Sequence, residues 1–345
     1  MIRVLADPSF SNSNPYVNLL YEGFNGLDVT VEPLTLQNAF RGADICHVHW
    51  PERGLTVSSF WESMNISLRL VTKVVVAKIR GAKIIWTVHN LQPHEQTQPI
   101  AWVKLFYFAW RKLVDGGIFL SHSSRSAYDD SYGPIGDSEV VPHGHYCSIY
   151  EGMIPTCNFK SELDIEDGDF VFGHYGLIRS YKNIPHLIEQ FSQLKGSNNK
   201  LIIAGKVRNG EEALGETIRR LAAGDDRISF IPRFLTDSEM LELYSFTDLA
   251  VFPYTRILNS GSAILALSLG CPVLVTKSPS MFELQDLVGD SVSLLDDLSD
   301  LTEIMLGHYA SGMPRVSSAQ LISLNWPDLS RLTLNFYKRV CSTIK

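Results

Sequence analysis

Several features that mark other classes of protein are missing from this sequence. No run approaches the roughly 18 uninterrupted apolar residues that a membrane-spanning helix needs, and the first residues lack the charged start and long apolar core of a signal peptide. The five cysteines are scattered, odd in number and without a C-x-x-C pair, which favours neither a disulfide framework nor a zinc site. The net charge of -7 argues against nucleic-acid binding. We therefore expect a cytoplasmic protein, at most peripheral on the inner face of the plasma membrane.

The sequence does contain a repeated alternation of short β-branched runs with helical patterns, which is typical of parallel sheets with crossover helices. Expected strands lie at 2–6, 29–33, 44–50, 83–89, 116–120 and 138–142, and then at 169–176, 200–206, 227–232, 248–254, 272–276 and 291–295. The polar, aperiodic stretch 143–168 reads as a linker. We expect two Rossmann-like α/β domains, 1–158 and 159–326, facing each other across a ligand-binding cleft, with the final helix within 327–345 packing back on the first domain.

Two cations follow the strand expected at 169–176. In the run GLIRSYKN, Arg179 and Lys182 come after Gly176 and just before a helix capped around Asn183. Free N–H groups at a helix start, together with two cations, make an anion site. Fixed cations would also stabilise the charge that grows on a diphosphate leaving group. The alternative is a pair of solvated loop cations, which are common.

A second candidate phosphate loop follows the strand expected at 248–254. Asn259, Ser260, Gly261 and Ser262 precede an apolar helix. Hydroxyls, an amide and an unhindered backbone at a helix start can hold phosphate oxygens. An ordinary helix cap with a Ser-Gly turn is the alternative.

These motifs carry a resemblance. Gly176 with Arg179 and Lys182, the run LIIAGK, the stretch 230–254 and SLGCPVLV resemble the donor domain of GT-B glycosyltransferases with glycogen-synthase-like sequences. The runs HVHWPE, WTVHNLQPHE, SHSSRSAY and VPHGHY in the first half resemble bacterial exopolysaccharide β-mannosyltransferases. The resemblance implies a GT-B fold, an N-terminal domain that binds the acceptor and a C-terminal domain that binds a nucleotide-diphosphate sugar. It further implies transfer of mannose from GDP-mannose to a glycan or a polyprenyl-diphosphate-linked oligosaccharide in cell-surface polysaccharide synthesis. Arg233 and Phe234, after the strand at 227–232, are expected to border the nucleotide base.

One departure from the family bears on the mechanism. Retaining members of the larger family carry two glutamates eight positions apart, where this sequence has Ile257 and Leu265. We therefore favour an inverting reaction, which needs one general base for the acceptor hydroxyl.

Candidates for that base lie in the first domain, after expected strands. Glu95 is the first choice and Glu52, which closes HVHWPE, is the second. His89 directly follows a strand, and in related enzymes this histidine approaches the donor sugar or phosphate. A purely structural hydrogen bond is the alternative for each of the three.

Two further sites are weaker. Asn12 and Ser13 lie in the loop after the first strand, where the family has a glycine-rich turn, and could contact acceptor or phosphate or simply cap a helix. Asp167-Gly168-Asp169 matches a metal-binding D-x-D motif, but it precedes a strand and reads as a solvated turn. We expect no metal and no other cofactor.

Segments 60–83 and 100–115 combine aromatic and apolar residues with Lys and Arg, and no acid lies between 63 and 83. Basic amphipathic helices of this kind bind anionic membrane surfaces, although many of their apolar residues must face the sheet. We expect peripheral membrane contact through these segments.

Alternative functions keep the same fold. They are a UDP-sugar-dependent transferase, a sugar-nucleotide epimerase or hydrolase, and a non-catalytic sugar-nucleotide-binding partner subunit. A nicotinamide oxidoreductase is disfavoured because no strand is followed by G-x-G-x-x-G with a downstream acid.

Overall fold

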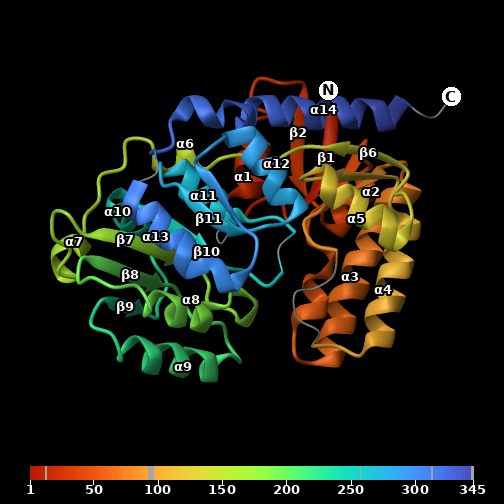
Figure 1. The fold of residues 1–345 in the computed structure, drawn as a ribbon. Helices are drawn as coiled ribbons and strands as arrows, with labels where there is room; N and C mark the ends of the chain where they lie inside the picture. The colour runs from red at the N-terminus through yellow and green to blue at the C-terminus, as the bar shows by residue number, and fades with distance from the viewer. Residues whose placement is uncertain (12–13, 92–96, 257, 312–313, 343–345) are drawn as a thin grey trace. The chain divides into compact units, whose positions relative to one another are not determined.

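The computed structural model describes residues 1–11, 14–91, 97–256, 258–311 and 314–342. The predicted site residues Asn12, Ser13 and Glu95 lie outside these described residues, as does Ile257. The chain divides into an N-terminal unit, residues 1–144 with 324–345, and a C-terminal unit, residues 145–323 (Figure 1). The divisions predicted from the sequence lie at 158 and 326.

The N-terminal unit is built on a parallel six-stranded sheet in the order β2-β1-β3-β4-β5-β6. Its strands are β1 (Ile2–Asp7), β2 (Val29–Pro33), β3 (Ile45–Val48), β4 (Lys83–Val88), β5 (Gly116–Phe119) and β6 (Asp137–Val140). Its helices are α1 (Tyr16–Glu22), α2 (Leu36–Arg41), the 3-10 helix η1 (Pro51–Thr56), α3 (Phe60–Ile79), α4 (Ile100–Leu113), α5 (His122–Tyr132) and α14 (Trp326–Ser342).

Side chains alternate between the two faces of this sheet because successive Cβ atoms of a strand point in opposite directions. Cys46, Ile84 and Trp86 pack in one apolar cluster with buried residues of α2, α3, α4 and α5. The neighbouring positions His47 and Thr87 lie on the opposite face, where His47 contacts Tyr21 of α1 and Tyr337 of α14.

Helix α14 joins the N-terminal unit although it closes the chain. Ser330 donates its hydroxyl to the Leu20 carbonyl at 2.8 Å, and Arg339 bonds Asp137 and Glu139 of β6, each at 2.8 Å. Its buried side, which includes Phe336, covers the sheet.

The C-terminal unit carries a second parallel sheet in the order β12-β11-β10-β7-β8-β9. Its strands are β7 (Phe170–Tyr175), β8 (Asn199–Ala204), β9 (Ile228–Ile231), β10 (Leu249–Phe252), β11 (Val273–Thr276) and β12 (Val292–Leu295). Its helices are α6 (Cys147–Tyr150), α7 (Phe159–Glu162), η2 (Ser180–Lys182), α8 (Ile184–Phe191), α9 (Glu212–Ala222), α10 (Asp237–Phe246), α11 (Gly261–Ser268), α12 (Pro279–Val288), η3 (Leu298–Asp300) and α13 (Leu301–Ser311), and η4 (Ser318–Leu324) leads to α14. Buried residues of α8, α9 and α13 form one cluster against this sheet.

The two parallel β/α sheets expected from the alternation are confirmed. The expected linker 143–168 differs from its prediction, because it contains two short helices and Phe159 is buried in the C-terminal unit. The helical patterns of this half of the sequence predict helices near 183–195, 211–223, 236–246 and 260–269, so helices α12 and α13 were not predicted. None of the described helices is both long enough and apolar enough to cross a membrane.

Candidate active site

In the C-terminal unit, the loop after β7 places a lysine over a glycine. Gly176 has a φ of 120°, which side chains other than glycine rarely adopt. A Cβ on Gly176 would lie 3.3 Å from Lys182 Nζ and 3.5 Å from Ser262 Oγ. A Cβ on Gly205, after the neighbouring strand β8, would collide with the Gly176 carbonyl oxygen. The two glycines therefore let the two loops approach closely, and the ammonium of Lys182 and the hydroxyl of Ser262 converge over the Gly176 backbone.

Lys182 is a buried cation. Only 4% of it is exposed, and burial, with the nearby Arg179 as a second cause, lowers its pKa from 10.5 to about 7. No carboxylate of the described chain pairs with Lys182 or Arg179, and the nearest aromatic contact of the ammonium is the Tyr254 ring, with Nζ 5.3 Å from its centroid. A cation that is taken out of water without a counter-ion costs free energy unless a ligand supplies the negative charge.

The loop at 259–262 is both a helix cap and a source of free donors. Ser260 is the N-cap of α11, and its Oγ accepts from Ala263 N at 3.1 Å. Ser260 is therefore a helix cap, as the alternative interpretation predicted. Its hydroxyl accepts the capping hydrogen bond and can still donate its own proton to a ligand. Gly261 opens the helix, and Asn259 Nδ2 is buried without a partner among the described residues. Asn183, in contrast, adopts the left-handed conformation before α8 and its side chain makes no capping bond.

Two more buried polar atoms that have no partner in the described chain lie close to Lys182. His174 holds the Val251 carbonyl through Nδ1 at 2.7 Å, and its Nε2 has no partner in the described chain. Burial, with Lys182 as a second cause, lowers the pKa of His174 to about 3, so the ring is neutral. The Tyr254 hydroxyl lies beside Ser260 and Ser262 but completes no hydrogen bond with either. Because buried polar groups are nearly always paired, these atoms indicate a polar ligand that the loops are built to receive.

The other predicted donor residues lie elsewhere in the C-terminal unit. Arg233 and Phe234 follow β9, which β8 separates from β7. Arg233 binds Glu239 at 2.6 and 3.0 Å, where Glu239 also closes the capping box of Thr236. Phe234 is 75% exposed. The structure shows no contact that links either residue to Lys182 within the described part of the chain.

In the N-terminal unit, three histidines form a chain of hydrogen bonds at the ends of β3 and β4. His47 contacts Thr87 through Nε2 at 2.7 Å, and its Nδ1 lies 2.6 Å from the Tyr337 hydroxyl and 3.2 Å from the Tyr21 hydroxyl. His49 Nε2 lies 2.9 Å from the Tyr21 hydroxyl. His49 Nδ1 lies 3.2 Å from His89 Nε2.

The proton positions in this chain follow from counting donors. Burial lowers the pKa of His47, His49 and His89, so each ring is neutral and carries one N–H. His47 Nδ1 has one lone pair at most and cannot accept from both tyrosines. His47 Nδ1 either accepts from Tyr337 or donates its own N–H. In both cases it cannot accept from Tyr21, so Tyr21 donates its proton to His49 Nε2. His49 then donates from Nδ1 to His89 Nε2.

His89 is consequently held as the tautomer with its proton on Nδ1. Its ring stacks on Trp50, with 4.3 Å between centroids, and packs edge-on against Tyr16 at 4.9 Å. No described residue accepts from Nδ1. His89 is partly exposed, so this N–H is available to an oxygen of a bound molecule, whereas its only lone pair is already used by His49.

Glu52 is a buried carboxyl in η1, only 5% exposed. Oε1 accepts from Asn90 Nδ2 at 3.4 Å, and Oε2 has no partner among the described residues. Burial raises the pKa of Glu52 to about 7. Such a group changes protonation near neutral pH, as a general acid or base must. Glu95, the first choice for that role, lies outside the described residues.

The D-x-D sequence forms a solvated turn. The Asp167 side chain is 98% exposed and pairs with Lys160 at 2.8 Å, and Gly168 has a φ of 104°. Within the described ranges no cluster of three His, Cys, Asp or Glu side chains could hold a metal ion.

Sequence reasoning missed His47, His49, His174, Tyr21 and Tyr254. One signal could have found the first pair, because His47 and His49 alternate with Val48 and so lie on one face of a strand. No sequence signal points to the two tyrosines, because each is remote in sequence from its partner. Tyr21 of α1 contacts His47 and His49, and Tyr254, after β10, contacts Lys182.

The two sheets have the arrangement of the GT-B fold, and the comparisons that follow identify the chain as a glycosyltransferase. Residues 169–307, which contain the Lys182 site, match the family described as glycosyl transferases group 1. The fold resembles that of the Anabaena protein HepE, solved with UDP and glucose, with a TM-score of 0.65 and 16% identity over 100% of this chain and 98% of that one. It also resembles a UDP-forming trehalose-phosphate synthase from Burkholderia vietnamiensis, with a TM-score of 0.68 and 11% identity over 99% of each chain.

Among characterised relatives, the chain is similar to the GDP-mannose:glycolipid 4-beta-D-mannosyltransferase of Xanthomonas campestris pv. campestris. The two are 25% identical over 337 residues, which cover 95% of this chain and 88% of the relative. The resemblance to exopolysaccharide mannosyltransferases that the sequence motifs indicated is thereby confirmed.

Proposed function

We propose that this glycosyltransferase moves mannose from GDP-mannose to a lipid-linked oligosaccharide or other glycan acceptor in the synthesis of a cell-surface polysaccharide. The donor and acceptor come from the name of the Xanthomonas relatives. The observation that carries the proposal is the buried Lys182 beside Ser262. Among the described residues Lys182 has no counter-ion, and three buried polar atoms near it have no hydrogen-bond partner. A diphosphate would supply the missing counter-charge.

The C-terminal loops stabilise the leaving group in this proposal. As the bond between the sugar and the diphosphate breaks, negative charge grows on the diphosphate oxygens, and fixed donors in a dry site stabilise it strongly. Lys182 and Arg179 supply positive charge, Ser260, Ser262 and the start of α11 supply hydroxyl and backbone donors, and Phe234 offers an exposed ring for the nucleotide base. Two protein cations thus serve the role that a metal ion has in other transferases, and we propose a reaction without a metal or other cofactor.

The N-terminal unit supplies the acceptor-side chemistry. In a single displacement the acceptor oxygen attacks the anomeric carbon, a base takes the hydroxyl proton, and the nucleoside diphosphate leaves, so the configuration is inverted. Glu95 and Glu52 are the candidate bases. His89 is not a candidate base, because its lone pair accepts from His49. We propose that its Nδ1–H donates to a substrate oxygen.

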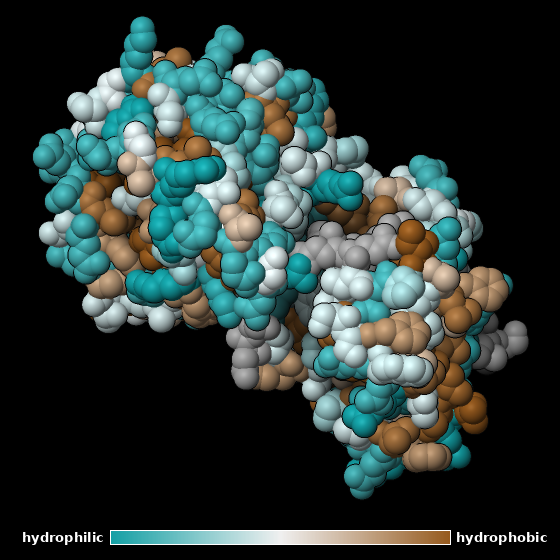
Figure 2. All heavy atoms as spheres, turned by 90° about the horizontal axis from the view of Figure 1, so that it is seen from below, coloured by the Kyte–Doolittle hydropathy of each residue, from teal (hydrophilic) through white to brown (hydrophobic). Residues whose placement is uncertain are grey.

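Peripheral membrane contact fits the surface of α3 and α4. Their buried sides include Leu70, Val74 and Trp110. Their exposed apolar residues are Phe60, Trp61, Leu68, Ile79, Ile100, Leu105 and Phe108. Figure 2 shows hydrophobic side chains gathered on this part of the N-terminal unit. Of the cations in 66–83, Lys78 pairs with Asp115, while Arg69 and Arg80 remain exposed for anionic lipid headgroups.

Titration of the protein with GDP, UDP, GDP-mannose and UDP-glucose, followed by thermal unfolding, tests the donor. Saturation at a hundred times Kd stabilises by about 2.7 kcal/mol. We expect the guanine compounds to stabilise most. A larger effect of UDP compounds would favour a UDP-sugar transferase instead, the ligand class solved with HepE. No effect of any of the four would refute the donor site.

Transfer itself is tested by incubating GDP-mannose with and without a lipid-linked acceptor. A transferase releases GDP only when acceptor is present, whereas a hydrolase or epimerase consumes donor without it. If donor binds but Glu95→Gln, Glu52→Gln and His89→Ala leave every transfer assay unchanged, the chain is a binding partner and not the catalyst.

A further inference from the structure

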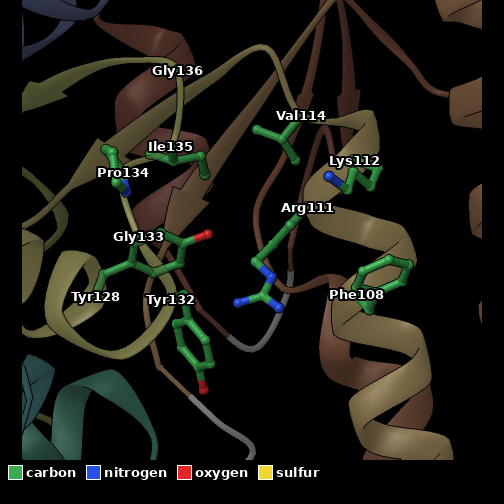
Figure 3. A pocket seen from close by; sticks show the side chains of 10 residues that line it. All are labelled: Phe108, Arg111, Lys112, Val114, Tyr128, Tyr132, Gly133, Pro134, Ile135 and Gly136. Carbon is green, nitrogen blue, oxygen red and sulfur yellow. The ribbon is translucent and has the colours of Figure 1, made fainter.

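A pocket of about 240 Å³ opens between α4 and α5 of the N-terminal unit (Figure 3). None of its lining residues belongs to the candidate active site. It is lined by Phe108, Arg111, Lys112, Val114, Tyr128, Tyr132, Gly133, Pro134, Ile135 and Gly136. Two of these residues are cations and none is acidic, although the chain as a whole carries a net charge of -7.

Arg111 has no counter-ion among the residues that the structure describes. Its guanidinium carbon lies 4.6 Å from the centroid of the Tyr132 ring, and Nε donates to the Tyr107 carbonyl at 3.2 Å. No described residue accepts from its two terminal amino groups. The stacked ring and the carbonyl fix the plane of the guanidinium, and its free edge is the part that binds phosphate or carboxylate through two parallel hydrogen bonds.

Two further donors face the same space. Figure 3 shows the Lys112 amine and the Arg111 guanidinium on the side of α4 that faces Tyr128 and Tyr132 of α5. Burial raises the pKa of Tyr128 to about 12, so its hydroxyl keeps the proton, and it makes no hydrogen bond to a described residue. A planar carboxylate would use the guanidinium edge alone. A tetrahedral oxyanion presents oxygens in several directions and can engage all three groups.

We infer that this pocket binds a phosphate group. Its volume is below the roughly 300 Å³ at which sites for drug-sized ligands begin, so it fits a headgroup and not a nucleotide sugar. The outer side of α4 carries exposed Ile100, Leu105 and Phe108 together with Lys104, and Phe108 also lines the pocket. A phosphate that arrives on a lipid would therefore bind here while the exposed apolar side chains enter the membrane surface. The proposal that a lipid carries this phosphate rests on the membrane contact proposed above, whereas the phosphate site itself does not.

Vesicle binding by matched variants tests the pocket. Sedimentation with phosphatidylcholine vesicles that contain phosphatidic acid is compared for the wild-type chain, Arg111→Gln and Arg80→Gln. Arg80 is an exposed cation on the same helical layer outside the pocket, so each variant loses one positive charge. Loss of one surface cation weakens binding roughly fivefold. We expect Arg111→Gln to weaken vesicle binding at least about tenfold more than Arg80→Gln does, because the charged hydrogen bonds from the guanidinium to the phosphate are lost as well. The stabilisation by GDP should stay unchanged in both variants, which separates this inference from the donor proposal.

Inorganic phosphate distinguishes the source. If millimolar phosphate stabilises the wild-type chain but not Arg111→Gln, and the vesicles show no dependence on Arg111, the phosphate site stands and the lipid source is wrong. The phosphate site would be overturned if Arg111→Gln and Arg80→Gln weaken vesicle binding equally and inorganic phosphate stabilises the wild-type chain no more than Arg111→Gln. Should Arg111→Gln lose the GDP response, Arg111→Lys and Arg80→Lys replace the pair, because lysine keeps the charge and removes the planar edge.

Discussion

Replacing Lys182 with methionine should stabilise the empty protein while it abolishes donor binding. The gap between the pKa values of 10.5 and about 7, at 1.36 kcal/mol per pKa unit, means that burial of the charged lysine costs about 5 kcal/mol. Methionine fills a similar volume without charge, so at pH 6 we expect Lys182→Met to raise the free energy of unfolding by about 5 kcal/mol.

The pH dependence of this difference has a definite sign. The unfolded chain keeps the lysine proton up to about pH 10.5, whereas the folded chain releases it near pH 7. Between these values the unfolded state binds more protons, so the stability of the wild-type chain rises with pH relative to Lys182→Met. The gain from the substitution should shrink by about 4 kcal/mol between pH 6 and pH 10. Thermal and denaturant unfolding of the C-terminal unit at both pH values measures it.

Donor binding should reverse the shift at Lys182. A diphosphate next to Nζ favours the ammonium, so at pH 8 binding of GDP should take up close to one proton, and at pH 6 almost none. Calorimetry in two buffers with different ionisation enthalpies measures this uptake. Lys206→Met, which removes an exposed lysine from the loop after β8, is the control and should keep both the binding and the proton uptake. Tight binding of GDP without proton uptake at pH 8 would refute the placement of the diphosphate beside Lys182.

Three other residues give further predictions. If Glu52 is the base, the transfer rate should rise with pH through about 7, where its carboxyl loses its proton. Glu52→Gln should remove this rise together with most of the rate. If Glu52→Gln keeps the pH profile of the wild-type chain, Glu95 is left as the base. Proton–nitrogen correlation spectra of the histidine side chains should show His89 protonated on Nδ1 alone. Tyr21→Phe should let the other tautomer of His89 appear. A proton on His89 Nε2 in the wild-type chain would contradict the hydrogen-bond count. Ser260→Ala and Ser278→Ala each remove an N-cap and should each cost about 1 kcal/mol of stability, but only Ser260→Ala should also weaken GDP binding in a titration.

The sequence alone was sufficient for the two-sheet architecture. Parallel strands buried on both faces must be apolar and β-branched, and each crossover needs a helix, so runs such as KIIWTV and KLIIAG identified strands β4 and β8 by pattern. It was also sufficient to select Lys182 and Ser260, because both stand directly after a strand and before a helix. Helices α12 and α13 were missed because residues 277–311 mix short apolar runs with polar ones and show no sustained period.

Only the tertiary structure decided the state of the site residues. That Lys182 is buried depends on Gly176 and Gly205, which let two loops meet, and on the Tyr254 ring. That His89 donates from Nδ1 follows from contacts that run through His49 to Tyr21, which lies far earlier in the chain. Protonation and tautomer are set by burial and by the count of nearby donors, and both depend on which distant segments pack together.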